Sequence, residues 1–464
     1  MSQLSVKTDQ EIEGKKLNFY AVAWRWHFYI GLLVTPIMIM LSITGIVYLF
    51  KPQLDPIMYP KLFVVAPTGH TQSADRMVEV LKNNYPNAQI KSFNPALDER
   101  SSAKFMLKDG DDTINVFMNP YTSEVLGVLN ENSHLQAIMM KLHGELLIGD
   151  IGDRIIELAV SWALVLMITG IYLWWPRGGG VTLFWPRWNT KGRKFWRDFH
   201  ASTGFWSALF FIVILFSGLT WTGYWGEQFA AVWSRFPEKM WNDVPKSDKK
   251  AIVLNTTSEK IVPWAIEQTA LPKSDEHAHH NMNEANPNNA SIGLQQAIDV
   301  INKQGIVAGY KVAYPKGADG VFTASVFPKD PKDETTIHVD QYTGKVLADI
   351  RFKDYHIVPK IVEYGIVLHK GIYFGLANQL MMLAISLLML ACCISGIIMW
   401  WKRRPLNSLG APASPKSQRI WKTAFLIMVF LGIAFPLVGL SFIAIMLFDW
   451  LVVKQIPYIR NKLH

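Results

Sequence analysis

Five long apolar stretches constrain the fold of this chain more than any other feature of its sequence. They lie near residues 28–50, 155–175, 202–225, 372–401 and 423–449 of the 464. A helix needs roughly 20 consecutive apolar residues to cross a bilayer core of about 30 Å, and each stretch meets that length. Half of all residues are hydrophobic. The sequence therefore predicts an α-helical membrane protein.

The net charge of +9 comes from Lys and Arg residues that cluster beside the apolar stretches. Short cytoplasmic loops of membrane proteins carry such an excess, so the charge needs no nucleic-acid partner to explain it. We expect residues 1–26, 176–199 and 402–422 in the cytoplasm. The long loops 51–142 and 226–365 are then extracytoplasmic.

The two long loops share one predicted pattern, a helix followed by an antiparallel sheet. In the first loop, Thr71 or Ser73 can cap the helix, and alternating strands such as TINVFM follow. In the second loop, Ser291 precedes a helix that Gly305 ends, and strands such as VFTASVF follow. The loops finish with the similar sequences NPYTSEVLG and DQYTGKVLA. Each half of the chain thus reads as span, small α+β domain, span, which predicts a parallel duplication.

Two histidines stand at the cytoplasmic start of outward spans. His27 lies in WRWHFYIGLL and His200 in WRDFHASTGFW, and each is followed four residues later by a glycine, Gly31 or Gly204. Ionisable residues at membrane depth are costly and usually functional. The matched spacing therefore points to a shared role.

A second pair, His143 and His369, stands at the extracytoplasmic start of the inward spans, in LHGELLIG and LHKGIYFG. Each is followed six residues later by a glycine and 31 residues later by the first residue of a WW pair: Gly149 and Trp174 for His143, Gly375 and Trp400 for His369. Coincidence does not readily produce two segments with the same His–Gly and His–Trp spacings, so we expect the two histidines to share a role.

Each histidine pair is expected at one membrane depth, because a parallel repeat has its twofold axis along the membrane normal. Two imidazoles facing each other at one level suit bis-axial ligation of a haem iron. Glycines one or two turns along would remove side-chain bulk where the flat macrocycle meets the backbone. No C-x-x-C-H sequence occurs, which excludes covalent attachment. The sequence predicts two b-type haems, one near each membrane face.

Other uses of the four histidines stay open. They could be interfacial or hydrogen-bonded residues, or form a proton relay. Zinc or copper is disfavoured, because a closed tetrahedral site needs four ligands and each layer offers two histidines. Arg25 and Arg197 suit haem propionates as well as lipid phosphates.

The remaining histidines have no partner at a repeated position. Four of them are expected on the surface: His70, His134, His338 and His356. Three more, in DEHAHHNMNEANPNN, could hold a metal, although their neighbours favour a solvated loop: His277, His279 and His280.

These patterns divide the chain into cytoplasmic segments, spans and extracytoplasmic domains. The predicted segments are an N-terminus (1–26), a first span (27–50), a first α+β domain (51–142), a second span (143–175), a cytoplasmic loop (176–199), a third span (200–225), a second α+β domain (226–365, with an insertion at 226–290), a fourth span (366–401), a cytoplasmic loop (402–422), a fifth span (423–449) and a C-terminal tail (450–464).

Paired H-x-x-x-G and LH-x-G-type spans around two loops that end in YTGKVL-like sequences resemble the PepSY-associated transmembrane family. The resemblance covers nearly residues 15–405. Members include iron-regulated inner-membrane proteins and ferrisiderophore reductases of the FoxB type. The resemblance implies periplasmic PepSY domains and haem ligation by His27, His200, His143 and His369. It leaves out the fifth span.

The resemblance implies an inner-membrane oxidoreductase that passes electrons across the membrane to a periplasmic ferric siderophore or other ferric chelate. No G-x-G-x-x-G fingerprint is present, so we expect a separate electron donor, either a cytoplasmic reductase or a quinol. Two other functions stay open. One is a non-redox PepSY protein that binds or senses in the envelope, and the other is a metal permease that uses the paired histidines.

Overall fold

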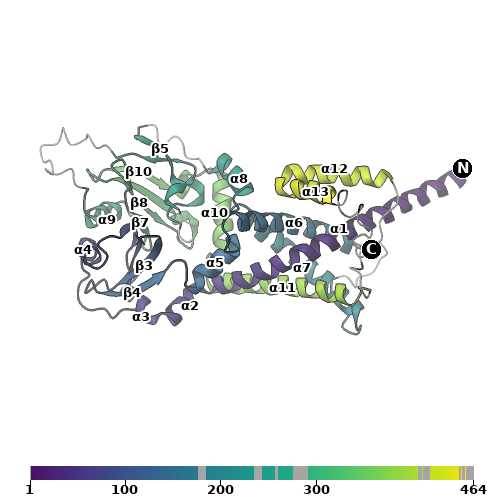
Figure 1. Ribbon diagram of the computed structural model, residues 1–464, viewed down its shortest axis with the longest axis horizontal. Helices are drawn as coiled ribbons and strands as arrows, with labels where there is room; N and C mark the ends of the chain where they lie inside the picture. Colours follow the sequence, from purple (N-terminus) through teal and green to yellow (C-terminus); the bar gives the residue numbers. More distant parts are fainter. Residues whose placement is uncertain are drawn as a thin grey trace. The chain divides into compact units, whose positions relative to one another are not determined.

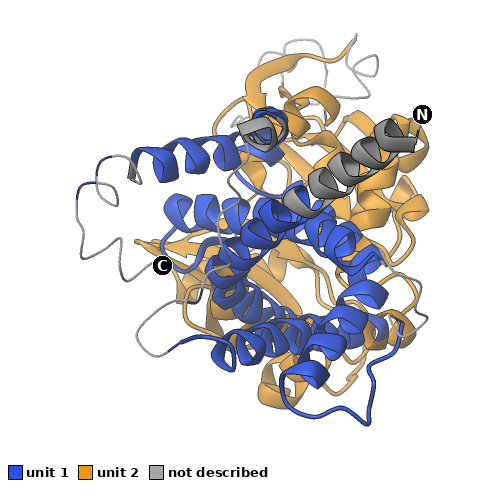
Figure 2. Ribbon diagram, turned by 90° about the vertical axis from the view of Figure 1, so that its right-hand side faces the viewer, with its two compact units in different colours: residues 1–46, 142–227, 381–464 blue, residues 47–141, 228–380 orange. Residues whose placement is uncertain are grey.

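The computed structural model describes residues 2–175, 184–234, 243–255, 260–274, 291–405, 410, 418–448, 451 and 455. Its contacts divide the chain into two compact units (Figure 2). Unit 1 comprises residues 1–46, 142–227 and 381–464, and unit 2 comprises residues 47–141 and 228–380. The possible metal ligands His277, His279 and His280 lie outside the described residues.

Within the described residues, four helices are long and apolar enough to cross a membrane (Figure 1). They are α1 (Ser2–Leu49, apolar from Phe19), α6 (Asp150–Trp174), α7 (Arg193–Leu219) and α11 (Leu376–Trp401). The apolar window of α6 is 56% buried, against 28–33% for the other three. Helix α6 is therefore the most enclosed of the four, and the chain is a membrane protein.

The second and fourth predicted spans, 143–175 and 366–401, are each broken into two helices. Helix α5 (Leu135–Glu145) ends before α6 because Leu146, Leu147 and Gly149 all have positive φ. Helix α10 (Ile357–His369) ends before α11, where Gly371 and Gly375 have positive φ. Left-handed residues cannot continue an α-helix. His143 therefore lies near the end of α5 and His369 at the end of α10, and each of these short helices precedes a membrane span.

The fifth predicted span, 423–449, is not a single helix. Two shorter helices replace it, α12 (Gln418–Ala434) and α13 (Pro436–Phe448). Pro436 begins the second helix, where a missing N–H costs nothing. The ring of Phe442 in α13 lies 4.8 Å from that of Trp162 in α6, and Trp162 Nε1 donates to Ser441 Oγ at 3.2 Å. Helix α13 therefore packs on α6.

Unit 2 contains one antiparallel sheet of eight strands in the order β10-β9-β8-β7-β1-β2-β3-β4. The first loop supplies β1 (Gln89–Asn94), β2 (Ala103–Asp109), β3 (Asp112–Met118) and β4 (Val125–Asn130). The second supplies β7 (Lys311–Ala313), β8 (Val321–Val326), β9 (Thr335–Asp340) and β10 (Val346–Arg351). Strands β1 and β7 pair through Ser92 with Ala313 and Phe93 with Val312. The sheets predicted for two separate domains are thus continuous.

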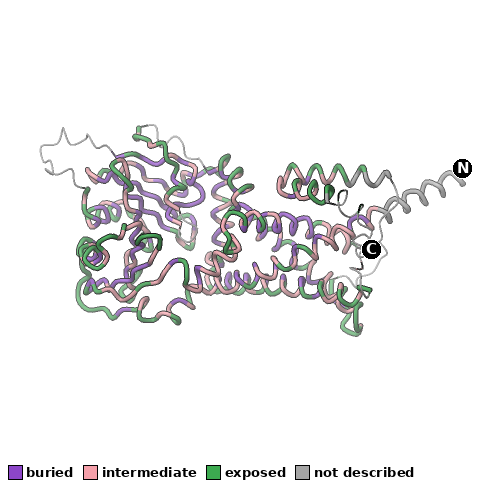
Figure 3. The backbone as a smooth tube through the Cα atoms, viewed as in Figure 1, coloured by how far each residue is buried: buried purple, intermediate pink, exposed green. Residues whose placement is uncertain are grey.

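Each set of four strands follows an amphipathic helix, α4 (Ala74–Asn84) or α9 (Leu294–Lys303), as predicted. Ser73 caps α4 by accepting from Arg76 N. Residues such as Leu81 and Ile301 bury the inner faces of the helices against the sheet core. All residues of β8 and β9 are buried (Figure 3).

The insertion covers the second half of the sheet. It contains α8 (Trp225–Trp233), β5 (Lys246–Lys250), β6 (Ala270–Pro272) and the 3-10 helices Ala251–Leu254 and Trp264–Ile266. Val262 and Ile266 of the insertion pack in one cluster with Ala313 and Ile350 of the sheet. Since Val312 belongs to the core under α4 and α9, its neighbour Ala313 faces the opposite side, as strand geometry requires. Helices α2 (Lys51–Met58) and α3 (Pro60–Phe63) complete the unit's first segment.

Substituting Phe105→Ala should lower the free energy of unfolding of unit 2 by about 3–5 kcal/mol. The ring is fully buried in β2 and lies 4.4 Å from that of Phe93, so truncation leaves a cavity. Thermal and urea unfolding, followed by far-UV circular dichroism on the full chain, measure the effect. Val128→Ala, at an exposed position in β4, is the control, and equal losses for both variants would contradict this account of the core.

Candidate functional site

The structure brings together the first predicted histidine pair. His27 projects from α1 and His200 from α7, and their ring centroids lie 6.3 Å apart with an interplanar angle of 84°. Both side chains are half-buried. The two imidazoles therefore face the same space within the helices of unit 1.

This separation fits two axial ligands of one haem iron. A metal–imidazole bond is about 2.0 Å long, and the ring centroid lies about 1.1 Å beyond the nitrogen, so trans ligands place their centroids about 6.2 Å apart. The nearly perpendicular ring planes do not oppose this arrangement, because each ring can rotate about its own metal–nitrogen bond. The separation of the two rings is therefore compatible with a haem held by His27 and His200.

The Nδ1 atom of each histidine in this pair is held by a different helix. His27 Nδ1 lies 3.0 Å from Thr169 Oγ1 in α6. His200 Nδ1 lies 2.9 Å from the carbonyl oxygen of Cys392 and 3.2 Å from Ser395 Oγ in α11. A carbonyl only accepts, so His200 carries its proton on Nδ1 and has its lone pair on Nε2. That tautomer can ligate a metal through Nε2.

His143 makes a contact of the same kind. At the end of α5, its Nδ1 lies 2.9 Å from Thr44 Oγ1 in α1. His369 ends α10 and belongs to unit 2, whereas His143 belongs to unit 1. The predicted pairing of His143 with His369 therefore stays a prediction.

The four predicted glycines have two different roles. Gly31 and Gly204 lie one turn beyond their histidines, and a Cβ at either would meet one side-chain atom at an ordinary distance of 3.9 or 3.8 Å. Space for a planar group beside them stays a prediction. Gly149 and Gly375 instead provide the positive φ values, 64° and 58°, that end one helix before the next begins.

The two predicted propionate partners make contacts within the protein. Arg197 Nη2 lies 2.9 Å from Asp198 Oδ1, and Asp198 also pairs with Arg187 at 2.6 Å. The guanidinium of Arg25 lies 5.4 Å from the ring centroid of Tyr29. Arg197 is thus already paired with a carboxylate, and a role for either residue in binding propionates stays a prediction.

The hydroxyl residues that contact the histidines were missed from the sequence, although a signal for them exists. Each of the four spans contains a Ser/Thr–Gly dipeptide at a matched position: Thr44–Gly45, Ser217–Gly218, Thr169–Gly170 and Ser395–Gly396. Thr44 and Ser217 follow His27 and His200 at equal spacing, and Thr169 and Ser395 likewise follow His143 and His369. The dipeptides therefore repeat in register with the histidines.

One of the histidines expected on the surface is in the core. His338 in β9 is fully buried, and its Nδ1 lies 2.9 Å from Thr323 Oγ1 of the paired strand β8. Burial lowers the pKa of His338 to about 3, so the ring is neutral. The prediction failed because TTIHV alternates too weakly to reveal that both faces of this strand are covered.

Helix α10, which carries His369, is anchored in unit 2 by buried carboxyl groups. Glu363 Oε1 accepts from Ala265 N at 2.9 Å, and Glu334 Oε1 accepts from Tyr355 Oη at 2.8 Å. Glu363 and Glu334 also hydrogen-bond to each other. Burial raises the pKa of Glu363 to about 7 and raises that of Glu334 well above its ordinary value. At least one of the two is therefore protonated at neutral pH.

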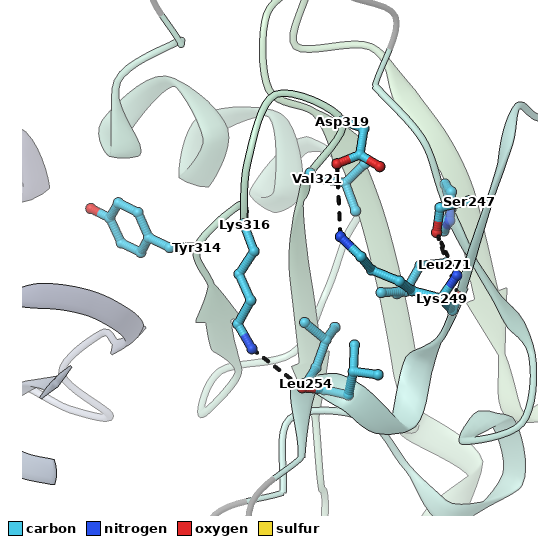
Figure 4. A pocket seen from close by; sticks show the side chains of 11 residues that line it. Ser247, Lys249, Leu254, Leu271, Tyr314, Lys316, Asp319 and Val321 are labelled. Carbon is cyan, nitrogen blue, oxygen red and sulfur yellow. Dashed lines mark hydrogen bonds and ion pairs between the residues drawn. The ribbon is translucent and has the colours of Figure 1, made fainter. Parts of the chain in front are cut away.

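A small pocket lies in unit 2 (Figure 4). Lys249 Nζ lies 3.9 Å from Asp319 Oδ1, and Lys316 Nζ donates to the carbonyl of Val253 at 3.3 Å. Both ammonium groups that line the pocket therefore have partners in the protein. None of the four paired histidines lines it.

The chain matches a known protein family. A family model described as the PepSY-associated TM region matches residues 24–403. The matched range includes all four paired histidines and their Ser/Thr–Gly dipeptides. No curated protein matches the chain.

Substituting Glu363→Gln should reduce the pH dependence of unfolding of unit 2. A carboxyl whose pKa rises on folding from 4.5 to about 7 stabilises the fold below pH 4.5, and that contribution is lost as the pH rises through 7. Melting temperatures measured at pH 5 and pH 8 should therefore differ less in the variant than in the wild type. Glu124→Gln, at an exposed position, is the control. An unchanged difference in Glu363→Gln would contradict the assignment.

Proposed function

The chain belongs to the PepSY-associated transmembrane family, and on this basis we propose that it is an inner-membrane di-haem b oxidoreductase. Its substrate is a periplasmic ferric siderophore or other ferric chelate. The observation that carries the haem proposal is the pair of rings of His27 and His200, 6.3 Å apart. The substrate class rests on family resemblance alone.

His27 and His200 would hold one haem as axial ligands. The second haem is proposed from the sequence repeat alone, with His143 and His369 as ligands. When bound, haem supplies reversible one-electron exchange between its ferric and ferrous forms. Among the described residues, no group of three or more His, Cys, Asp or Glu that could hold a metal ion is found.

The protein contributes the positions of the two histidine ligands and keeps other ligands away from the iron. If His27 and His200 both held the iron, no place on it would be left for dioxygen or the chelate, and the haem would supply outer-sphere electron transfer. The basic segments at the helix ends support a cytoplasmic side for His27 and His200. We therefore propose that the electron comes from a cytoplasmic reductase or a quinol.

The reaction at the substrate is a one-electron reduction of Fe(III) to Fe(II). The donor supplies the electron, and no bond to the protein forms or breaks. Fe(II) is a softer cation than Fe(III), so hard oxygen ligands of a siderophore hold it less tightly. The product is iron that can leave the chelator and enter an uptake pathway.

Purified wild-type protein should be red, with a b-type reduced spectrum and two haems per chain. His27→Ala and His200→Ala should each remove the same haem, because one axial imidazole alone holds the group weakly. His143→Ala and His369→Ala should remove the other. A pyridine haemochrome assay measures the content, and His356→Ala, at an exposed position, is the control. Colourless wild-type protein would favour a non-redox envelope protein or a metal permease.

Protein reduced with dithionite and then freed of reductant should be reoxidised rapidly by ferric siderophores without oxygen. Stopped-flow absorbance in the haem α-band measures the rate, and a ferrous-iron chelator traps the product. The gallium-loaded siderophore is the matched control, because Ga(III) has the same charge and cannot accept an electron under these conditions. Slow reoxidation at a rate independent of the chelate would contradict the reductase proposal.

A further inference from the structure

The hydroxyl groups of the Ser/Thr–Gly dipeptides have their own protons committed within their helices. Thr44 Oγ1 donates to the carbonyl of Met40 at 2.8 Å, and Thr169 Oγ1 donates to that of Val165 at 2.8 Å. Ser395 Oγ donates to the carbonyl of Cys392 at 2.9 Å. Each oxygen can then only accept from the histidine that faces it.

This pattern assigns the tautomer of three histidines. Nδ1–H of His27 donates to Thr169, Nδ1–H of His143 donates to Thr44, and Nδ1–H of His200 donates to the carbonyl of Cys392 and to Ser395. In each ring the lone pair is therefore on Nε2.

The glycines of the dipeptides allow the rings to approach. A Cβ at Gly170 would lie 3.2 Å from His27 Cε1, and one at Gly45 would lie 3.4 Å from His143 Cε1. A Cβ at Gly396 would lie 3.4 Å from His200 Cε1. The same ring atom faces the glycine in all three cases. At Gly170 the distance is tighter than ordinary van der Waals contact, and at Gly45 and Gly396 it is at the short limit of such contact. A side chain longer than that of alanine at these positions would press on the imidazole.

Hydroxyl residues in membrane helices often donate to the preceding turn without any further role. Ser42 in α1 provides an example, because its Oγ donates to the carbonyl of Met38 at 2.8 Å and isoleucine follows it. The three dipeptides differ from Ser42, because each combines this bond with a facing Nδ1 atom and a glycine in contact with the same imidazole.

We infer that the Ser/Thr–Gly dipeptides position the metal-binding histidines: the hydroxyl oxygen holds Nδ1–H, the glycine admits the ring, and Nε2 is presented in one orientation. The inference rests on the proposed function where it names the metal as haem iron. Ser217–Gly218 has the same place in the repeat, and Ser217 Oγ donates to the carbonyl of Ile214 at 2.9 Å.

A hydrogen bond from Nδ1–H fixes the ring of a metal-bound histidine and raises its basicity, and losing such a partner typically costs about 10–100-fold in metal affinity. A more basic ligand favours ferric over ferrous iron. Removing the acceptor should therefore raise the midpoint potential of that haem.

Each of these rings interacts with a backbone carbonyl as well as with a hydroxyl oxygen. His200 donates to the carbonyl of Cys392. The backbone of Leu166 interacts with His27 in the same way, and that of Leu41 with His143. Loss of the hydroxyl should therefore have a similar effect in all three dipeptides.

The test uses the full chain in lipid nanodiscs with Thr169→Val, Thr44→Val and Ser395→Ala, and with Ser42→Ala as control. Valine keeps the volume of threonine and removes the hydroxyl. Three quantities are measured: haem affinity, midpoint potential by spectroelectrochemical titration, and the largest g value of the low-spin ferric EPR signal, which reports the angle between the imidazole planes.

Thr169→Val and Thr44→Val should each weaken the affinity for one haem about 10–100-fold, raise its potential and shift its g value. Ser395→Ala should change the haem held by His200 in the same direction, and Thr169→Ser should restore the wild-type values. Wild-type affinity, potential and g values in both valine variants would overturn the inference while leaving the haem proposal intact.

Histidine ¹⁵N chemical shifts of the protein separate the two proposals. The shifts should report Nδ1–H for His27 in the wild type and a mixture of tautomers in Thr169→Val. This readout does not require bound haem, so wild-type protein without haem would refute the proposed function and still allow the positioning role to be tested. A single Nδ1–H tautomer in both proteins would overturn the inference.

Discussion

The structure of unit 1 depends on satisfying imidazole groups inside an apolar environment. A buried polar group without a partner costs free energy in any protein and more in lipid. Here each partner comes from a different helix, so the bond that satisfies His27 also joins α1 to α6, and the bonds of His200 join α7 to α11. The contact of His143 with Thr44 joins α5 to α1. The same contacts thus fix the packing of the helices and the direction of the histidine rings.

The membrane spans and the secondary structure of the loops could be predicted because they rest on local patterns. The apolar windows predicted the four long helices, and period-two alternation predicted strands such as β3 and β8. The pairing of β1 with β7 could not be predicted. It joins Phe93 to Val312 across more than two hundred residues. Nothing in the sequence of either strand indicates which strand it pairs with.

Breaks in helices were the other limit. Gly149 and Gly375 were noticed for their spacing from His143 and His369, and their lack of a side chain was taken as the reason. Their positive φ is the feature that the structure uses. Leu146 and Leu147 also adopt positive φ. Leucine rarely has this conformation, so nothing in the sequence indicated it there. The proximity of His27 and His200 was predicted from their repetition, whereas the pairing of His143 with His369 stays a prediction. Thr169 and Ser395 repeat in the sequence as well, but only the packed helices show that they contact the histidines.

The eight-stranded sheet has a consequence for how the two long loops can behave. Among the described residues, pairing β1 with β7 leaves β4 and β10 as the two edges of this sheet, where two separate four-stranded sheets would expose four. Open edges invite association with other chains, so the fusion halves the number of strands at which such association could begin. Neither long loop can rotate against the other without breaking the main-chain hydrogen bonds between β1 and β7. The eight strands must therefore move together as one rigid body.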